Sequence, residues 1–171
     1  MLKVLYGDIF QSKAEALVNP VNCVGVMGKG LALLFKRAYP DMFQEYAKIC
    51  KHNQLFIGNL FTYETTTMNI IQDNTDLIKM RIKYNQPRYI INLPTKMHWK
   101  DKSNLFDISV GLKRLVREIG MLEIQSIAVP ALGCGCGGLS FDQSLQVMLD
   151  CLSPVFETKR EVYIYKPLPS I

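Results

Sequence analysis

Apolar residues in this chain fall into two kinds of segment, which alternate along most of its length. Short apolar runs bounded by glycine, proline or turn residues, such as residues 2–6 and 124–130, are typical of buried strands. Longer segments repeat apolar residues at helical spacing, as in the segment that starts at Gly30 and ends before Pro40. The pattern predicts strands at residues 2–6, 16–18, 59–65, 88–93, 124–130 and 161–165, and helices from Gly30, from near Asp41, over 103–119 and from Ser140 or Phe141 to Leu152.

This alternation of strands and helices predicts an α/β fold with a largely parallel sheet that helices cover on both faces. Ser103 is the expected N-cap of the third helix. Residues 66–86 show no sustained period, so we expect an insertion there in what is otherwise one domain over residues 1–171. Ligands of such sheets bind beyond the carboxyl ends of the strands, so the loops that follow the strands are the candidate sites.

Composition narrows the class of protein. The chain has 49% hydrophobic residues, but it has no apolar run near the roughly 20 residues of a membrane span and no signal-peptide pattern after Met1. We therefore expect a cytoplasmic protein without a membrane partner. Five cysteines are an odd number, and the spacing of Cys134 and Cys136 suits neither a disulfide framework nor a zinc knuckle. His52 and His98 lie far apart in the sequence, so we expect reduced thiols, no metal and no cofactor.

A net charge of +5 favours anionic partners, although the 20 basic residues are scattered among 15 acidic ones and are mostly expected to be solvated. One local group differs from this background. Lys96, Lys100 and Lys102 flank Trp99, the single tryptophan, in the loop after the strand at residues 88–93. These lysines are suited to phosphates, with a merely solvated loop as the alternative.

Two further loops after predicted strands are rich in glycine. The first, residues 19–30, holds three glycines and two asparagines and leads directly into a helix, whose free N–H groups favour a phosphate. A plain strand-to-helix turn is the alternative, but it needs one glycine only. The second, residues 133–138, has four glycines in six positions, which cost backbone entropy without an evident packing gain and suit a wrapped diphosphate. The first loop lacks Walker A spacing and the second lacks the GxGxxG order, which argues against a hydride-transfer cofactor.

Two side chains near these loops have the chemistry of a site. Lys96 shares the loop at residues 92–100 with His98 and Trp99. If burial beside a ligand removes its proton, it becomes a nucleophile for an anomeric carbon; the alternatives are a surface lysine and a tryptophan that caps the core. Asp8 follows the first strand, where its carboxylate either accepts a hydrogen from a purine amino group or closes an Asx turn after Gly7.

The segment Gly7-Asp8-Ile9 and the two glycine-rich loops, in this order, resemble the macrodomain family over nearly the whole chain. The strings VNCVGVMGKGLALLFKRAYPDMFQEY and INLPTKMHW look like its DarG-like branch, antitoxins that remove ADP-ribose from DNA, and the related terminal ADP-ribose glycohydrolases. The resemblance implies a three-layer α/β/α fold with a mixed, largely parallel sheet and ADP-ribose lying across its crest.

For individual residues, the resemblance implies that Asp8 holds the adenine amino group with the Ile9 backbone nearby, and that Asn22 lies at the distal ribose. Lys96 would act at C1 of that ribose, by attack or by electrostatic assistance. The other implied contacts are Gly28, Lys29, Gly30, Gly133, Cys134, Gly135, Cys136, Gly137, Gly138 and Tyr165, the last of which is otherwise a core tyrosine.

One position departs from the related glycohydrolases. In the terminal ADP-ribose glycohydrolases an acidic residue in the second glycine loop completes the reaction, whereas here that position is Gly137 and the nearest downstream carboxylate is Asp142. This departure argues against a covalent lysine mechanism with acid resolution, and it leaves His98 or a substrate phosphate as the helper. Trp99, which could stack a base, is the other accessory candidate.

The resemblance as a whole implies an ADP-ribosyl glycohydrolase whose ligand is ADP-ribose and whose substrate is ADP-ribosylated DNA or protein. A cognate ADP-ribosyltransferase toxin is the implied partner. A binding module that recognises ADP-ribose without hydrolysing it is an alternative of a different class. A phosphatase that acts on ADP-ribose 1''-phosphate is a third.

Overall fold

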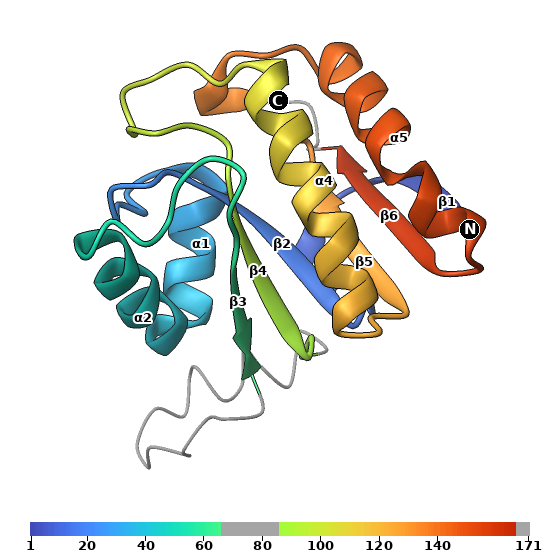
Figure 1. The fold of residues 1–171 in the computed structure, drawn as a ribbon, viewed down its shortest axis with the longest axis horizontal. Coiled ribbons are helices and arrows are strands. Elements are labelled where there is room, and N and C mark those ends of the chain that lie inside the picture. Colours follow the sequence, from blue (N-terminus) through green and yellow to red (C-terminus); the bar gives the residue numbers. More distant parts are fainter. Residues whose placement is uncertain (66–85, 167–171) are drawn as a thin grey trace.

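The computed structural model describes residues 1–65 and 86–166, which form a six-stranded sheet with helices on both faces (Figure 1). The strand order is β1-β6-β5-β2-β4-β3; β3 is antiparallel to β4, and the other neighbours are parallel. The mixed, largely parallel sheet predicted for this chain is therefore confirmed. The strands are β1 (Leu2–Tyr6), β2 (Ala16–Val21), β3 (Phe61–Glu64), β4 (Tyr89–Pro94), β5 (Ser126–Pro130) and β6 (Glu161–Lys166). The helices are α1 (Gly30–Ala38), α2 (Pro40–Lys51), α4 (Leu105–Met121) and α5 (Phe141–Glu157), with 3-10 turns η1 (Ile9–Gln11) and η3 (Gly135–Gly137).

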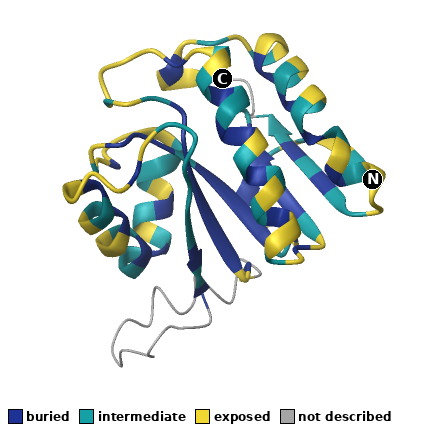
Figure 2. Cartoon of the chain, in the orientation of Figure 1, coloured by how far each residue is buried: buried dark blue, intermediate teal, exposed yellow. Residues whose placement is uncertain are grey.

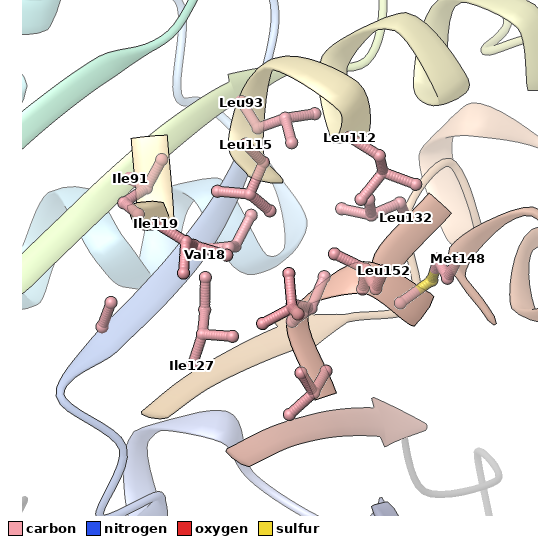
Figure 3. Close-up of a cluster of buried hydrophobic side chains, with 14 of the residues drawn as sticks. Val18, Ile91, Leu93, Leu112, Leu115, Ile119, Ile127, Leu132, Met148 and Leu152 are labelled. Atoms are coloured by element: carbon pink, nitrogen blue, oxygen red, sulfur yellow. The ribbon is translucent and has the colours of Figure 1, made fainter. Parts of the chain in front are cut away.

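The central strands β2, β4 and β5 are buried on both faces, because their successive side chains point into opposite helical layers, whereas no residue of the edge strand β1 is buried. In β2, Leu17 packs with the buried side chains of α1 and α2, whereas Val18 packs with those of α4 and α5. Figure 3 shows this second layer, where Leu112 and Leu115 of α4 and Leu152 of α5 meet the strands. Buried strands between helices with exposed outer faces (Figure 2) confirm the three-layer α/β/α arrangement.

β2 and β5 pair only near their beginnings and then separate. Their ladder joins Ala16 to Ile127 and Leu17 to Ala128, whereas the ladder between β2 and β4 continues as far as Val21. From β2 the chain continues to β3 and β4 on one side, and from β5 to β6 on the other. A ligand crevice is expected at such a switch point.

Two prolines account for the separation. The Val21 carbonyl accepts a hydrogen bond from the chain directly after β4 (2.9 Å). Successive residues of a strand direct their backbone N–H and C=O groups to opposite sides, so the backbone of Pro20 faces β5. The Ala131 N–H donates to β6 (3.0 Å), so Pro130, one residue earlier, directs its backbone toward β2. Since proline has no N–H, neither strand can donate a ladder hydrogen bond to the other at these positions. The carboxyl edge of the sheet therefore opens between β2 and β5.

β2 is longer than the sequence pattern predicts, and Asn19 belongs to the strand instead of the loop. Its side-chain amide donates to Oδ1 of Asn92 in β4 (2.9 Å), and both side chains are completely buried. One of the two asparagines that marked the first glycine-rich loop is thus a structural residue that joins two strands.

α4 begins two residues later than expected. The Asn104 side chain accepts the Asp107 N–H (2.8 Å) and caps this helix, so Ser103 is not its N-cap. An asparagine directly after a serine satisfies the same capping rule, and the sequence pattern could not choose between them.

α5 continues past Leu152 to Glu157, although Pro154 lies inside it. Proline has no N–H, so the Asp150 carbonyl, four residues earlier, loses its helical donor. The Ser153 hydroxyl donates to that carbonyl instead (3.1 Å), and the helix continues.

The remaining boundaries agree with the sequence pattern to within two residues. The insertion expected at residues 66–86 lies almost wholly outside the described residues, so this prediction and the single domain over 1–171 stay predictions. No helix in the described ranges is long and apolar enough to cross a bilayer.

Replacing Asn104 with alanine is expected to lower the free energy of unfolding by about 0.5–2 kcal/mol, because the first turn of α4 loses its side-chain acceptor. Ser103→Ala is the matched variant. The Ser103 Oγ has no hydrogen-bond partner within the described residues, so its removal should leave the free energy of unfolding unchanged or raise it. Denaturant unfolding compares both variants with the parent. A greater loss for Ser103→Ala than for Asn104→Ala would return the cap to Ser103.

Candidate ligand-binding site

A cleft of about 810 Å³ lies at the carboxyl edge of the sheet, a volume typical of small-molecule sites. Pro20 and Pro130 line it where β2 and β5 part. The other walls come from the ends of β1 and β6 and from the loops after β2, β4 and β5. All five parallel strands therefore contribute to one site.

This cleft brings together most of the residues predicted from the sequence. Those that line it are Asp8, Ile9, Asn22, Gly28, Lys29, Gly30, Lys96, Trp99, Gly133, Cys134, Gly135, Cys136, Gly137 and Tyr165. His98 and Gly138 are not among the lining residues. His98 Nδ1 accepts the Lys100 N–H within its own loop (3.2 Å), and Gly138 packs beside the side chain of Lys102.

Sequence reasoning missed several lining residues, most of them apolar. They are Gly7, Pro20, Val21, Val26, Leu31, Ala32, Leu34, Thr95, Ser103, Pro130 and Ala131. Leu31 and Leu34 lie on one side of α1, and Leu34 is 47% exposed. Apolar residues at helical spacing are typical of a core-facing side, whereas Leu34 faces the open cleft. The sequence pattern predicts Ser103 as a helix cap, whereas in the structure it lines the cleft.

Asp8 closes a turn at the edge of the cleft, as the structural alternative proposed. Its Oδ1 accepts the Phe10 N–H (2.9 Å) and caps η1, while the side chain remains exposed. A carboxylate has two oxygens and several lone pairs, so this turn is compatible with a contact to a ligand.

Asn22 holds the first glycine-rich loop together from inside. Its Oδ1 accepts the N–H groups of Val24 (3.1 Å) and Val26 (3.3 Å), and its Nδ2 donates to the Val26 carbonyl (2.6 Å). The Tyr46 hydroxyl donates to Oδ1 (3.0 Å) and to the Asn22 carbonyl (2.8 Å). Burial raises the pKa of Tyr46 above its ordinary value, so this phenol stays protonated as a donor.

Cys23 connects the first loop to the loop that carries Lys96. Its N–H donates to the Met97 carbonyl (2.9 Å). Burial, with a smaller effect of the nearby Cys50, raises the pKa of the Cys23 thiol to about 11, so this thiol is uncharged at neutral pH. All five cysteines are free thiols, as predicted.

Lys96 is half-buried and bridges two loops of the cleft. Its Nζ donates to the carbonyls of Trp99 (3.2 Å) and Asp101 (3.1 Å) in its own connection and to that of Cys136 in the second glycine loop (3.2 Å). An ammonium has three N–H donors, and these contacts use all of them. An amine acting as a nucleophile would have to lose one proton and one of these contacts.

The second glycine loop needs two of its glycines for packing. A Cβ at Gly133, whose φ is +72°, would lie 2.6 Å from Ile108 Cδ1 in α4. A Cβ at Gly137 would lie 2.5 Å from Ser103 Oγ. The expectation that these glycines bring no packing gain is therefore wrong for these two positions, because side chains of the β4–α4 connection and of α4 fill the space.

Positive groups line the middle of the cleft. The first residues of α1 form part of its wall, and their N–H groups have no side-chain cap from the N-cap residue, Lys29, and no acidic residue in the first turn. The helix start, Lys29 and Lys96 together favour an anion. Within residues 1–65 and 86–166, no group of three or more His, Cys, Asp or Glu side chains is placed to hold a metal ion.

Comparison with known proteins agrees with this architecture. The family model described as Macro domain matches residues 18–148. The chain is 43% identical to the DNA ADP-ribosyl glycohydrolase of Thermus aquaticus, over 98% of this chain and 42% of that protein. It is 41% identical to the DNA ADP-ribosyl glycohydrolase of Mycobacterium tuberculosis, over 92% of this chain and 40% of that protein. The chain thus spans about two fifths of the length of these two relatives.

Solved structures show the same fold. The macrodomain of Mycobacterium tuberculosis DarG matches with a TM-score of 0.84 at 40% identity, over 98% of this chain and 99% of that one. Thermosipho africanus DarTG in complex with ADP-ribose matches with a TM-score of 0.82 at 34% identity, over 99% of this chain and 42% of that one. Fold and cleft define an α/β/α domain with a cleft of small-molecule size at the carboxyl edge of its sheet. The chain belongs to the macrodomain family.

Gly137→Ala is expected to lower the free energy of unfolding by about 1–3 kcal/mol, because the added methyl group would lie 2.5 Å from Ser103 Oγ and 3.0 Å from Ser103 Cβ. Adding Ser103→Gly removes both contacts and should restore part of the loss. Gly28→Ala is the control: its Cβ would meet Val26 Cγ1 at an ordinary 3.7 Å, so we expect a change below about 0.5 kcal/mol. Equal losses for the two glycine variants in denaturant unfolding would contradict this packing.

Proposed function

We propose that this macrodomain is an ADP-ribosyl glycohydrolase that removes mono-ADP-ribose from DNA. The observation that carries the proposal is the Lys96 ammonium, which bridges the β4–α4 connection and the second glycine loop inside the cleft. Relatives 41% and 43% identical to this chain are named DNA ADP-ribosyl glycohydrolases, which supports the same reaction here.

In this proposal the ligand lies along the cleft from β1 to the Lys96 loop. The adenine lies near Asp8, Ile9 and Tyr165, which line one end of the cleft. The distal ribose lies near Asn22 and Lys96 at the other end. A relative from Thermosipho africanus is described as a complex with ADP-ribose, and this supports the choice of ligand.

The diphosphate lies between the start of α1, at Gly28, Lys29 and Gly30, and the second glycine loop. The N–H groups of Gly137, Gly138 and Leu139 close turns within that loop. The Cys134 N–H donates to the Ala131 carbonyl, so within the described residues the N–H groups of Gly133, Gly135 and Cys136 are left for phosphate oxygens. The remaining loop residues shape this wall.

Lys96 assists the reaction as an ammonium. The bond between C1 of the distal ribose and the modified base breaks, and its electron pair stays with the base. Water supplies the oxygen that bonds to C1, and a proton passes to the departing base. A positive charge beside this bond stabilises the departing group without giving up a hydrogen bond. The three carbonyl contacts of Lys96 favour this role over nucleophilic attack.

Trp99 makes DNA the favoured carrier of the ADP-ribose. It lines the cleft, is 50% exposed and has Lys100 Nζ 5.0 Å from its ring centroid. An exposed aromatic face beside lysines suits a stacked base and its phosphates. A relative from Thermosipho africanus is named a fusion of a DNA ADP-ribosyl transferase with a DNA ADP-ribosyl glycohydrolase, which supports a cognate transferase as partner of this chain.

One observation favours the alternative of a reader that binds ADP-ribose without hydrolysing it. Gly137 carries no carboxylate, and Asp142, in the first turn of α5, is not among the residues that line the cleft. Turnover assays separate the reader from the enzyme.

Lys96→Ala is expected to lower kcat by about 10²–10³-fold, since the positive charge at the reacting bond is lost. Lys96→Arg keeps a charge that cannot act as a nucleophile and should retain more activity than Lys96→Ala. The substrates are an oligonucleotide with base-linked ADP-ribose and a protein with ester-linked ADP-ribose. The control variant is Lys113→Ala, because Lys113 is exposed on α4. Binding of ADP-ribose without turnover of either substrate would establish the reader. Equal turnover by the parent and Lys96→Ala would remove Lys96 from the mechanism.

Trp99→Ala is expected to reduce kcat/KM for the modified oligonucleotide by about 5- to 100-fold, the range for loss of one stacked base. The ester-linked protein should be turned over at nearly the parent rate. Phe106→Ala is the control, because Phe106 is 75% exposed but does not line the cleft. An equal loss on both substrates would assign Trp99 to the binding of ADP-ribose itself.

A further inference from the structure

We propose that Ser103 is a ligand-binding residue of the cleft, whose hydroxyl donates a hydrogen bond to an oxygen of the bound ADP-ribose moiety. The proposal rests on the proposed function and adds to it a contact on the β4–α4 connection.

The first observation is a buried hydroxyl without a partner. Ser103 is 7% exposed, and its Oγ has no hydrogen-bond partner within residues 1–65 and 86–166. A buried polar atom left unpaired is costly, and native structures rarely keep one without a reason. Ser103 also lines the cleft, so a ligand is the available source of a partner.

The second observation is the position of Ser103 against the second glycine loop. Its N–H donates to the Gly137 carbonyl (3.0 Å), and its Oγ lies where a side chain at Gly137 would begin. One residue earlier in that loop, the Cys136 carbonyl accepts Lys96 Nζ (3.2 Å). Ser103 and Lys96 therefore contact successive residues of the same loop.

This position gives Ser103 a chemical role. A Cβ at position 137 would lie 2.5 Å from the Ser103 Oγ and 3.0 Å from its Cβ, so the serine hydroxyl occupies the space that a side chain there would take. A hydroxyl cannot replace a carboxylate as a base at neutral pH, but it can donate to an anionic or ribose oxygen. Ser103 is thus a residue that binds and orients the ligand, and it takes part in no covalent step.

The Ser103 Oγ is buried and lies where a Cβ at position 137 would be, so it packs against a residue without a side chain. A residue without Cβ loses little on a change of backbone conformation, so a small shift of the loop can bring Oγ within reach of a ligand oxygen. Binding then gives the hydroxyl the partner that the protein itself does not supply.

Calorimetry with ADP-ribose on Ser103→Ala tests the proposal. We expect the Kd to rise about 10- to 100-fold, as for loss of a hydrogen bond to a charged group, while the melting temperature without ligand stays the same or rises. These opposite directions distinguish ligand binding from a structural role. Ser126→Ala is the control: its Oγ accepts the Glu15 N–H (2.9 Å) at the opposite edge of the sheet, so its loss should lower the melting temperature and leave the Kd unchanged.

Two outcomes would overturn the proposal while leaving the proposed function intact. One is an equal Kd for the parent and Ser103→Ala. The other is a loss of affinity accompanied by a lower melting temperature, which would make Ser103 a structural residue. A parent that does not bind ADP-ribose would overturn the proposed function and this contact together.

Discussion

The parting of β2 and β5 is the constraint on which the site depends. Pro20 and Pro130 direct their backbones at each other's strand, and neither has an N–H to donate. A continuous ladder would close the carboxyl edge of the sheet, and no cleft would form between the strand ends. Because the two strands part, the loops after them can approach a ligand from both sides, and the neighbouring strands add the two ends of the site.

Hydrogen bonds between loops then keep this opening in shape. Cys23 joins the first glycine loop to the β4–α4 connection. Lys96 and Ser103 join the β4–α4 connection to the second glycine loop. Asn22 and Tyr46 fix the first loop from inside. The residues with the chemistry of the site are therefore also the residues that position its walls. A change at one loop is expected to be felt at the next, since contacting residues seldom act independently.

Several residue types serve both packing and chemistry, and this limits what a pattern can predict. Glycines in the second loop looked like ligand contacts alone, yet Gly133 and Gly137 are required by Ile108 and Ser103, which come from distant sequence. For Asp8 the pattern fits a ligand contact and a turn equally well, and in the structure its Oδ1 closes the turn. Ser103 matched a helix cap, but the adjacent Asn104 takes that role. The glycine contacts depend on neighbours far along the chain, whereas the Asp8 turn and the Asn104 cap are local hydrogen bonds between alternatives that the pattern fits equally well.

The sequence by itself determined the class of fold, the order of the elements and the loops that form the cleft. Those properties depend on local periodicity, turn residues and the rule that parallel strands direct their carboxyl ends to one edge. Only the tertiary structure decided which side chains face the cleft, where Leu34 and Ser103 line the wall and His98 does not. It also decided that Lys96 is held by three carbonyls. The physical reason is that burial and hydrogen-bond partners arise from contacts between segments that local periodicity does not relate.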